Sequence, residues 1–159
     1  MRSSQLRSEG RDGVGEGTYR NEREAEAVVK LAKQVTDTSD YEPGDIGVIT
    51  PYNGQKYLLS KLLGEAFESN SQDSDTTGEG TIEVNTVDGY QGREKRVIIF
   101  SAVRSNRGKK VGFLSDGRRL NVALTRAKDA LIVVADVKAV SEGDKKLGQF
   151  CSWVGSNEN

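Results

Sequence analysis

The sequence has 159 residues, the size of one domain, and its 35% hydrophobic and 30% charged residues allow a modest core. It contains no histidine, which excludes Ser-His-Asp and Cys-His centres. Its single cysteine, Cys151, excludes an internal disulfide and a cysteine-rich metal site, so no metal ligands are assigned. No apolar run is long enough to span a bilayer and the polar N-terminus is unlike a signal peptide, so we expect an intracellular protein, cytoplasmic or nuclear.

The net charge of −1 conceals an uneven distribution, because residues 1–80 are net acidic and residues 81–159 are net basic. A basic half is suited to facing the phosphates of a nucleotide or a nucleic acid. The same charges also describe an ordinary solvated surface. Charge alone therefore leaves both interpretations open.

The N-terminal part of the chain predicts a flexible segment followed by a helix. Residues 1–18 are polar and glycine-rich and are expected to be poorly ordered. A helix is predicted from Asn21, which together with Glu24 resembles a capping box. Its apolar residues recur at helical spacing and are Ala25, Val28, Val29, Ala32 and Val35. The domain is therefore expected to cover residues 19–155, with a short tail at 156–159.

Four short apolar segments after this helix predict strands that alternate with helices or long crossovers. The strands are expected at residues 46–50, 82–87, 97–103 and 130–136. Helices are expected at residues 55–67, 118–127 and 144–154. Nearly continuous apolar strands indicate a mainly parallel sheet covered on both faces, so the predicted fold is a three-layer α/β domain.

Polar, glycine-rich loops are expected at the carboxyl ends of these strands, where α/β sheets carry their functional groups. They are TPYNGQ at residues 50–55, TVDGYQGRE at residues 86–94 and VRSNRGKK at residues 103–110. No G-x-x-x-x-G-K followed by Ser or Thr occurs in the sequence, and no apolar strand ends in an Asp-Glu pair. This sequence therefore lacks a phosphate loop of its own, and it is predicted to be inactive as an ATPase by itself.

Three motifs appear in a fixed order along the chain. They are IGVITPYNGQ at residues 46–55, VNTVDGYQGREKRVIIFSAVRS at residues 84–105 and RRLNVALTRAKDALIVVAD at residues 118–136. In this order they resemble motifs IV, V and VI of superfamily-one helicases, in the branch of the up-frameshift and senataxin-type enzymes. The preceding GTYRNEREAE is similar to the segment before motif IV, whereas Arg96 stands where that family often has an acidic residue.

The resemblance implies the C-terminal, RecA-like motor domain of an ATP-dependent helicase, with Arg126 as its arginine finger. Arginine is a permanently charged fork of donors, suited to a γ-phosphate whose charge is redistributed during transfer. ATP and Mg²⁺ would be held mainly by an N-terminal RecA-like domain, in cis or on a separate chain. The alternative for Arg126 is a helix-terminal ion pair with Asp88, Glu94 or Asp116.

The segment around the second motif is expected to face the nucleotide. The resemblance implies nucleotide contacts for Gln91, Gly92 and Glu94, with the Glu94 carboxylate accepting hydrogen bonds from ribose hydroxyls. The alternative for Glu94 is an ion pair with Arg119 or Lys95. Arg104 and Asn121 are expected to support this site, by orienting Glu94 or Arg126 and by fixing the local helix geometry.

The ends of the first two strands are expected to hold single-stranded RNA or DNA. The resemblance assigns this contact to Thr50, Tyr52, Gln55 and Thr86, with Tyr52 stacking on a base or sugar. The alternative for Thr50 and Thr86 is that each hydroxyl caps the following turn.

Two other functions stay open from the sequence. A non-catalytic module derived from a helicase would bind nucleic acid or protein, which the missing phosphate loop permits. A small-molecule α/β enzyme is the third reading, although neither a dinucleotide-binding glycine motif nor a nucleophile elbow occurs.

Overall fold

The structure is a computed structural model that describes residues 19–67, 80–103 and 116–135. Its helices are α1 (Glu22–Thr38), α2 (Asn53–Phe67) and α3 (Gly117–Leu124), with short 3-10 helices η1 (Pro43–Asp45) and η3 (Asp88–Tyr90). Its strands are β1 (Ile46–Thr50), β2 (Glu83–Thr86), β3 (Lys95–Ser101) and β4 (Ala127–Val134).

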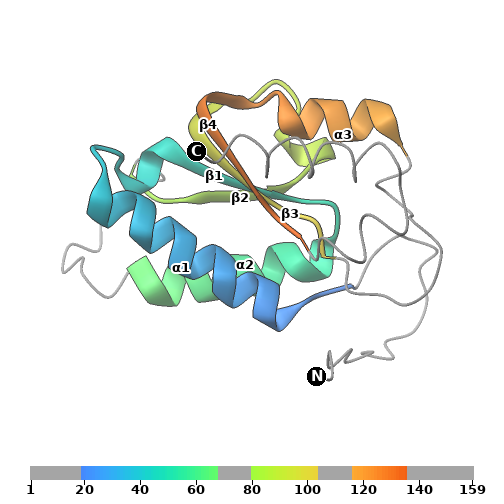
Figure 1. Ribbon diagram of the computed structural model, residues 1–159. Coiled ribbons are helices and arrows are strands. Elements are labelled where there is room, and N and C mark those ends of the chain that lie inside the picture. The colour runs from blue at the N-terminus through green and yellow to red at the C-terminus, as the bar shows by residue number, and fades with distance from the viewer. Residues whose placement is uncertain (1–18, 68–79, 104–115, 136–159) are drawn as a thin grey trace.

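The four strands form one parallel sheet in the order β2-β1-β3-β4. Helices α1 and α2 cover one face of this sheet, and α3 lies on the other face (Figure 1). This arrangement confirms the predicted three-layer α/β fold of RecA-like type with a parallel sheet.

Alternating side chains of β3 fill the two layers of the core. Val97 and Ile99 pack with the apolar residues of α1 and α2. Ile98 and Phe100 point to the opposite face and pack with Ala123 of α3. Strands buried on both faces need such continuous apolar runs, which is why the central strands were readable from the sequence.

The start of α1 follows the predicted cap only in part. Asn21 Oδ1 accepts the backbone N–H of Glu24 over 3.1 Å, as an N-cap does. The backbone N–H of Asn21, which a capping box would give to Glu24, donates instead to Gln55 Oε1 over 2.8 Å. The capping-box prediction is therefore corrected to a cap that ties α1 to α2.

Several element boundaries differ from those predicted. Helix α3 ends at Leu124, and β4 begins at Ala127 rather than at residue 130. The reason is pairing with the neighbouring strand, because Ala127 lies opposite Lys95 in the parallel ladder. Strand β3 likewise begins two residues early and ends at Ser101 rather than at residue 103. The predicted helix at 144–154 and flexible segment at 1–18 lie outside the described residues.

The connection from β2 to β3 crosses one face of the sheet. Val87 and η3 lead the chain away from the end of β2, and Tyr90 is fully buried. A side chain at Gly47, near the start of β1, would overlap the Tyr90 hydroxyl, so this ring reaches the amino end of the sheet. Residues 91–94 therefore lie before β3, at the amino edge, and not at the carboxyl end of a strand as predicted.

Candidate functional site

The predicted site residues divide between two opposite edges of the sheet. All strands run in one direction, so their carboxyl ends meet at one edge and their amino ends at the other. Thr50 and Thr86 end β1 and β2, whereas Glu94 and Arg126 immediately precede β3 and β4. The residues predicted to face a nucleotide therefore lie apart from those predicted to face a nucleic acid.

Glu94 and Arg126 are neighbours at the amino edge although they are distant in the sequence. The backbone N–H of Lys95 donates to the Arg126 carbonyl over 3.2 Å. Beside this bond, a Glu94 carboxylate oxygen lies 3.8 Å from Lys128 Nζ. The alternative for Glu94 is an ion pair with Arg119 or Lys95. The structure pairs Glu94 with Lys128 instead, while Arg119 binds Asp88 and Lys95 binds Glu83 and the Gly44 carbonyl.

The Arg126 guanidinium is half-buried at the end of α3. Its Nε donates to the carbonyl of Val122 over 3.1 Å, and Nη2 donates to Thr125 Oγ1 over 3.3 Å. Both bonds fix the direction of the side chain without neutralising it. Within the described ranges, Arg126 forms no ion pair with any carboxylate.

The three carboxylates that could have neutralised Arg126 are engaged with other groups. Asp88 pairs with Arg119 over 2.5 Å. Asp116 caps α3, where its side chain accepts backbone N–H groups, and Glu94 faces Lys128. The alternative prediction of a helix-terminal ion pair is therefore wrong for the residues that the structure describes.

The Gln91–Gly92 turn leads the chain into the amino edge. Both residues are exposed, and Gly92 has a φ of 74°, a conformation that glycine adopts without strain. The turn is closed by the backbone N–H of Arg93, which donates to the Tyr90 carbonyl over 3.1 Å.

The two residues predicted to support the nucleotide site have different outcomes. Asn121 is exposed on α3, and its backbone carbonyl accepts from the N–H and the hydroxyl of Thr125 over 3.1 and 2.8 Å. Asn121 thus takes part in ending the helix through its main chain. Arg104 lies outside the described residues.

Thr50 and Thr86 are register partners at the carboxyl edge. Thr86 Oγ1 accepts the backbone N–H of Gly89 over 3.3 Å and so caps η3, as the alternative for this residue predicts. Thr50 is fully buried, and its hydroxyl has no hydrogen-bond partner among the residues that the structure describes. An unsatisfied buried hydroxyl is rare enough that it indicates either a local cost or a place for a partner.

Gln55 and Tyr52 lie inside the domain rather than on its surface. Gln55 is 0% exposed, and its amide donates to Ser101 Oγ and to the Asn21 carbonyl, both over 3.2 Å. Tyr52 is 5% exposed and packs against Tyr19, whose ring meets it edge to face. In this structure neither side chain is open to direct contact with a nucleic acid.

A buried polar network lies at the carboxyl edge, and the sequence pattern does not predict it. A Glu24 carboxylate oxygen accepts from Ser101 Oγ over 2.6 Å and from the backbone N–H of Val103 over 2.8 Å. Val103 has a φ of 62°, unusual for a β-branched residue, at the turn that leaves β3. The available signal was the spacing, because Glu24 stands one helical turn before the buried Val28.

Arg96, the departure from the family pattern, contacts residues of β4, of η1 and of the loop before η1. Its Nε donates to Asp129 over 2.7 Å, a hydrogen bond that raises the pKa of the guanidinium. It also lies 3.8 Å from Asp45 and stacks on the Tyr41 ring at 4.6 Å. These contacts give Arg96 a structural place at the amino edge.

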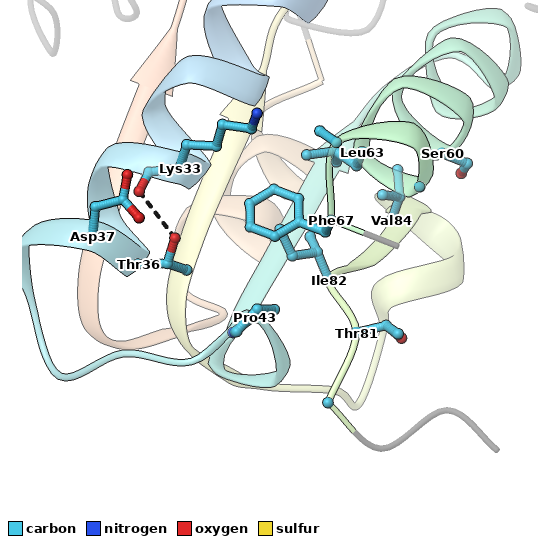
Figure 2. A pocket seen from close by; sticks show the side chains of 13 residues that line it. Lys33, Thr36, Asp37, Pro43, Ser60, Leu63, Phe67, Thr81, Ile82 and Val84 are labelled. Carbon is cyan, nitrogen blue, oxygen red and sulfur yellow. Dashed lines mark hydrogen bonds between the residues drawn. The ribbon is translucent and has the colours of Figure 1, made fainter. Parts of the chain in front are cut away.

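A pocket of about 650 Å³ lies on the face covered by α1 and α2. Figure 2 shows Lys33 and Thr36 on α1 opposite Leu63 and Phe67 on α2, with Ile82, which directly precedes β2, beside Phe67. None of the predicted site residues lines it, so it is separate from both candidate edges.

In the described ranges, no three acidic, cysteine or histidine side chains gather to hold a metal. No helix in these ranges is long and apolar enough to cross a membrane.

Comparison with known proteins relates most of the chain to helicases. Residues 3–138 match a family described as an AAA domain. DNA polymerase alpha-associated DNA helicase A of Saccharomyces cerevisiae is 40% identical over 89% of this chain and 19% of its own length. The regulator of nonsense transcripts 1 homolog of Drosophila melanogaster is 41% identical over 81% of this chain and 10% of its own. The DNA replication ATP-dependent helicase/nuclease DNA2 of Bos taurus is 42% identical over 80% of this chain and 11% of its own length. The chain thus spans only a tenth to a fifth of the length of these relatives.

Proposed function

Since the chain belongs to the AAA domain family, we propose that it is the second RecA-like motor domain of a superfamily-one helicase, of the up-frameshift and senataxin-like branch. The observation that carries the proposal is the Arg126 guanidinium at the amino edge, which forms no ion pair with a described carboxylate. The ordered motifs and the helicase relatives support the same conclusion.

Arg126 is suited to act as an arginine finger. One side of its fork is held by Val122 and Thr125, so the side chain loses little freedom when it meets a ligand. A half-buried, positively charged fork of donors matches the oxygens of a phosphate. In the proposal this guanidinium stabilises the charge that develops on the γ-phosphate of ATP.

Glu94, Gln91 and Gly92 would form the rest of the nucleotide-facing edge. The Glu94 carboxylate is exposed, and its 3.8 Å pair with Lys128 is of a weak kind, so it is free to accept ribose hydroxyls instead. The described residues contain no cluster of acidic ligands for Mg²⁺. ATP and Mg²⁺, which supply the phosphoryl group and its neutralising charge, would thus be held mainly by an N-terminal RecA-like domain, in cis or on another chain.

The carboxyl edge would provide part of a track for single-stranded RNA or DNA. Thr50 and Thr86 are register partners there, and the half-buried Thr86 hydroxyl can donate to a phosphate. Thr50 is 0% exposed, so it would support this edge from inside the domain. Gln55 and Tyr52 support this edge from inside the domain, which replaces the direct contact predicted for them.

Coupling between the two proposed edges would pass through the sheet itself. Strands β1 and β3 are adjacent and buried on both faces, so their two ends move as one body. Closure of a cleft at Arg126 would therefore reposition the threonines at the opposite edge.

The proposal is tested by ATP hydrolysis in the chain fused behind the first motor domain of a helicase relative. Arg126→Ala is expected to lower turnover by about a thousandfold or more. Arg118→Ala, an exposed arginine on α3 that forms no ion pair with the described residues, is the matched control and should leave turnover unchanged. Unchanged turnover in Arg126→Ala would remove the arginine-finger role.

A further inference from the structure

We propose that Tyr19 is a stacking platform for one base of the single strand at the carboxyl edge, an inference that rests on the proposed function. Tyr19 is 59% exposed, whereas Tyr52 beneath it is 5% exposed. The sequence predicts the stacking contact for Tyr52, and the structure moves the accessible aromatic surface to Tyr19.

The contact between the two rings holds Tyr19 while leaving it open. Their centroids are 5.3 Å apart with an angle of 72° between the planes, which is an edge-to-face pair. Such a contact covers at most one face of the Tyr19 ring. A base can therefore stack on an aromatic surface whose position is already fixed.

Two hydrogen bonds between the Gln55 side chain and the Asn21 backbone fix the segment that carries this ring. The Gln55 amide accepts from the N–H of Asn21 over 2.8 Å and donates to its carbonyl over 3.2 Å. Because Gln55 is buried in the first turns of α2, Tyr19 is tethered at the point where α1 and α2 both begin. The buried Gln55 thus positions a nucleic-acid contact without making one.

The charges around Tyr19 favour a nucleic acid over an apolar partner. Arg20 is exposed beside it, and Lys56 lies in the first turn of α2. Neither forms an ion pair with the carboxylates that the structure describes, and Glu22 is the acidic residue nearest in sequence. A stacking ring next to cations combines base contact with attraction for the phosphate backbone, the pairing used by proteins that bind single strands without reading sequence.

The proposal is tested with the 159-residue chain and fluorescently labelled oligo(U) and oligo(dT) of about 12 nucleotides, by anisotropy at low salt. Tyr19→Ala is expected to weaken binding by roughly 5-fold to 100-fold, and Tyr19→Phe to stay within about twofold of wild type. The control is Tyr57→Ala, which removes a ring that is 71% exposed on α2, and it should bind as wild type does.

A second oligonucleotide separates stacking from a loss of structure. With abasic sites at every position, Tyr19→Ala and wild type should bind equally, because no base remains to stack. A persistent difference on the abasic strand would overturn the proposal. If wild type binds both normal strands and Tyr19→Ala matches it, the stacking role fails while the proposed track stands; if wild type binds neither strand, the track and the stacking role fall together.

Discussion

The carbonyl of Arg126 accepts the backbone N–H of Lys95 over 3.2 Å, so the residue after Glu94 is joined directly to the proposed arginine finger. A main-chain bond between two strand ends does not change with side-chain rotamers. The spacing between the main-chain positions that carry Glu94 and Arg126 is therefore set by the sheet. Rigid elements position functional groups more accurately than loops do.

Glu24→Ala is expected to destabilise the fold by about 2–3 kcal/mol, because Ser101 Oγ and the backbone N–H of Val103 lose their acceptor in a buried place. Urea unfolding followed by circular dichroism measures the loss. Glu22→Ala, in the same turn but exposed, is the control and should change stability by less than about 0.5 kcal/mol. Equal stability of the two variants would show that the buried network contributes nothing.

Tyr90→Phe is expected to leave stability unchanged or to raise it by about 1 kcal/mol. The Tyr90 hydroxyl is buried and has no hydrogen-bond partner in the described part of the chain, so its removal relieves a desolvation cost and loses none of the described bonds. Thermal and urea unfolding of the two proteins provide the comparison. A loss above about 1 kcal/mol would mean that the hydroxyl has a stabilising partner.

The same residue predicts a dependence of stability on alkaline pH. Burial, and then the nearby Glu83 carboxylate, raise the pKa of Tyr90 above its ordinary value of about 10. Below about pH 10 the phenol is protonated in both states and has no effect. Above it the unfolded chain ionises first, so the stability of wild type should fall by up to about 1.4 kcal/mol per pH unit more than that of Tyr90→Phe. Parallel curves for the two proteins between about pH 9 and pH 11 would contradict the prediction.

Gly47→Ala is expected to destabilise the domain because a β-carbon there would overlap the Tyr90 hydroxyl and lie 2.8 Å from Ile98 Cδ1. Overpacking of this kind costs about 1–3 kcal/mol. In a double-mutant cycle, the cost should shrink when Tyr90 is also changed to Phe, because the first obstacle is gone. If the free-energy changes of Gly47→Ala and Tyr90→Phe were strictly additive, the Tyr90 hydroxyl would not be in contact with position 47.

Gly92→Ala is expected to cost about 1–2 kcal/mol for a different reason. Apart from its two chain neighbours, no described residue lies within 4 Å of a β-carbon built at Gly92, so the penalty comes from its φ of 74°. Gly92→Asn should cost less, since asparagine tolerates this conformation better. Unfolding midpoints for the two variants test the order, and a larger loss for Asn would reverse the interpretation.

The fold was predictable because its signals are local. The apolar run of β1 coincides with the predicted strand, and the helical spacing of α1 follows from Ala25, Val28 and Ala32. The signal for the start of β4 is not local. Ala127 is in a strand because it pairs with Lys95 of β3, and the sequence around Ala127 does not indicate this pairing.

The sequence predicts which residues form the candidate site, and these roles stay predictions, but it does not predict how the residues are arranged. Gln91 and Glu94 follow β2 in the sequence, and only the burial of Tyr90 across the sheet places them at the opposite edge. The contacts of Glu24 with Ser101 and Val103 join residues far apart in the chain, which no periodicity predicts.

The most direct test of the central claim is single-turnover ATP hydrolysis by the chain fused to a first motor domain, measured together with nucleotide affinity. Arg126→Ala should lower the rate of the chemical step by about a thousandfold or more while the affinity for ATP changes far less, because the guanidinium acts on charge that develops during transfer. Arg126→Lys should recover only a small part of this rate, since it keeps the charge and loses the fork. An Arg126→Ala protein that hydrolyses bound ATP at the wild-type rate would contradict the account.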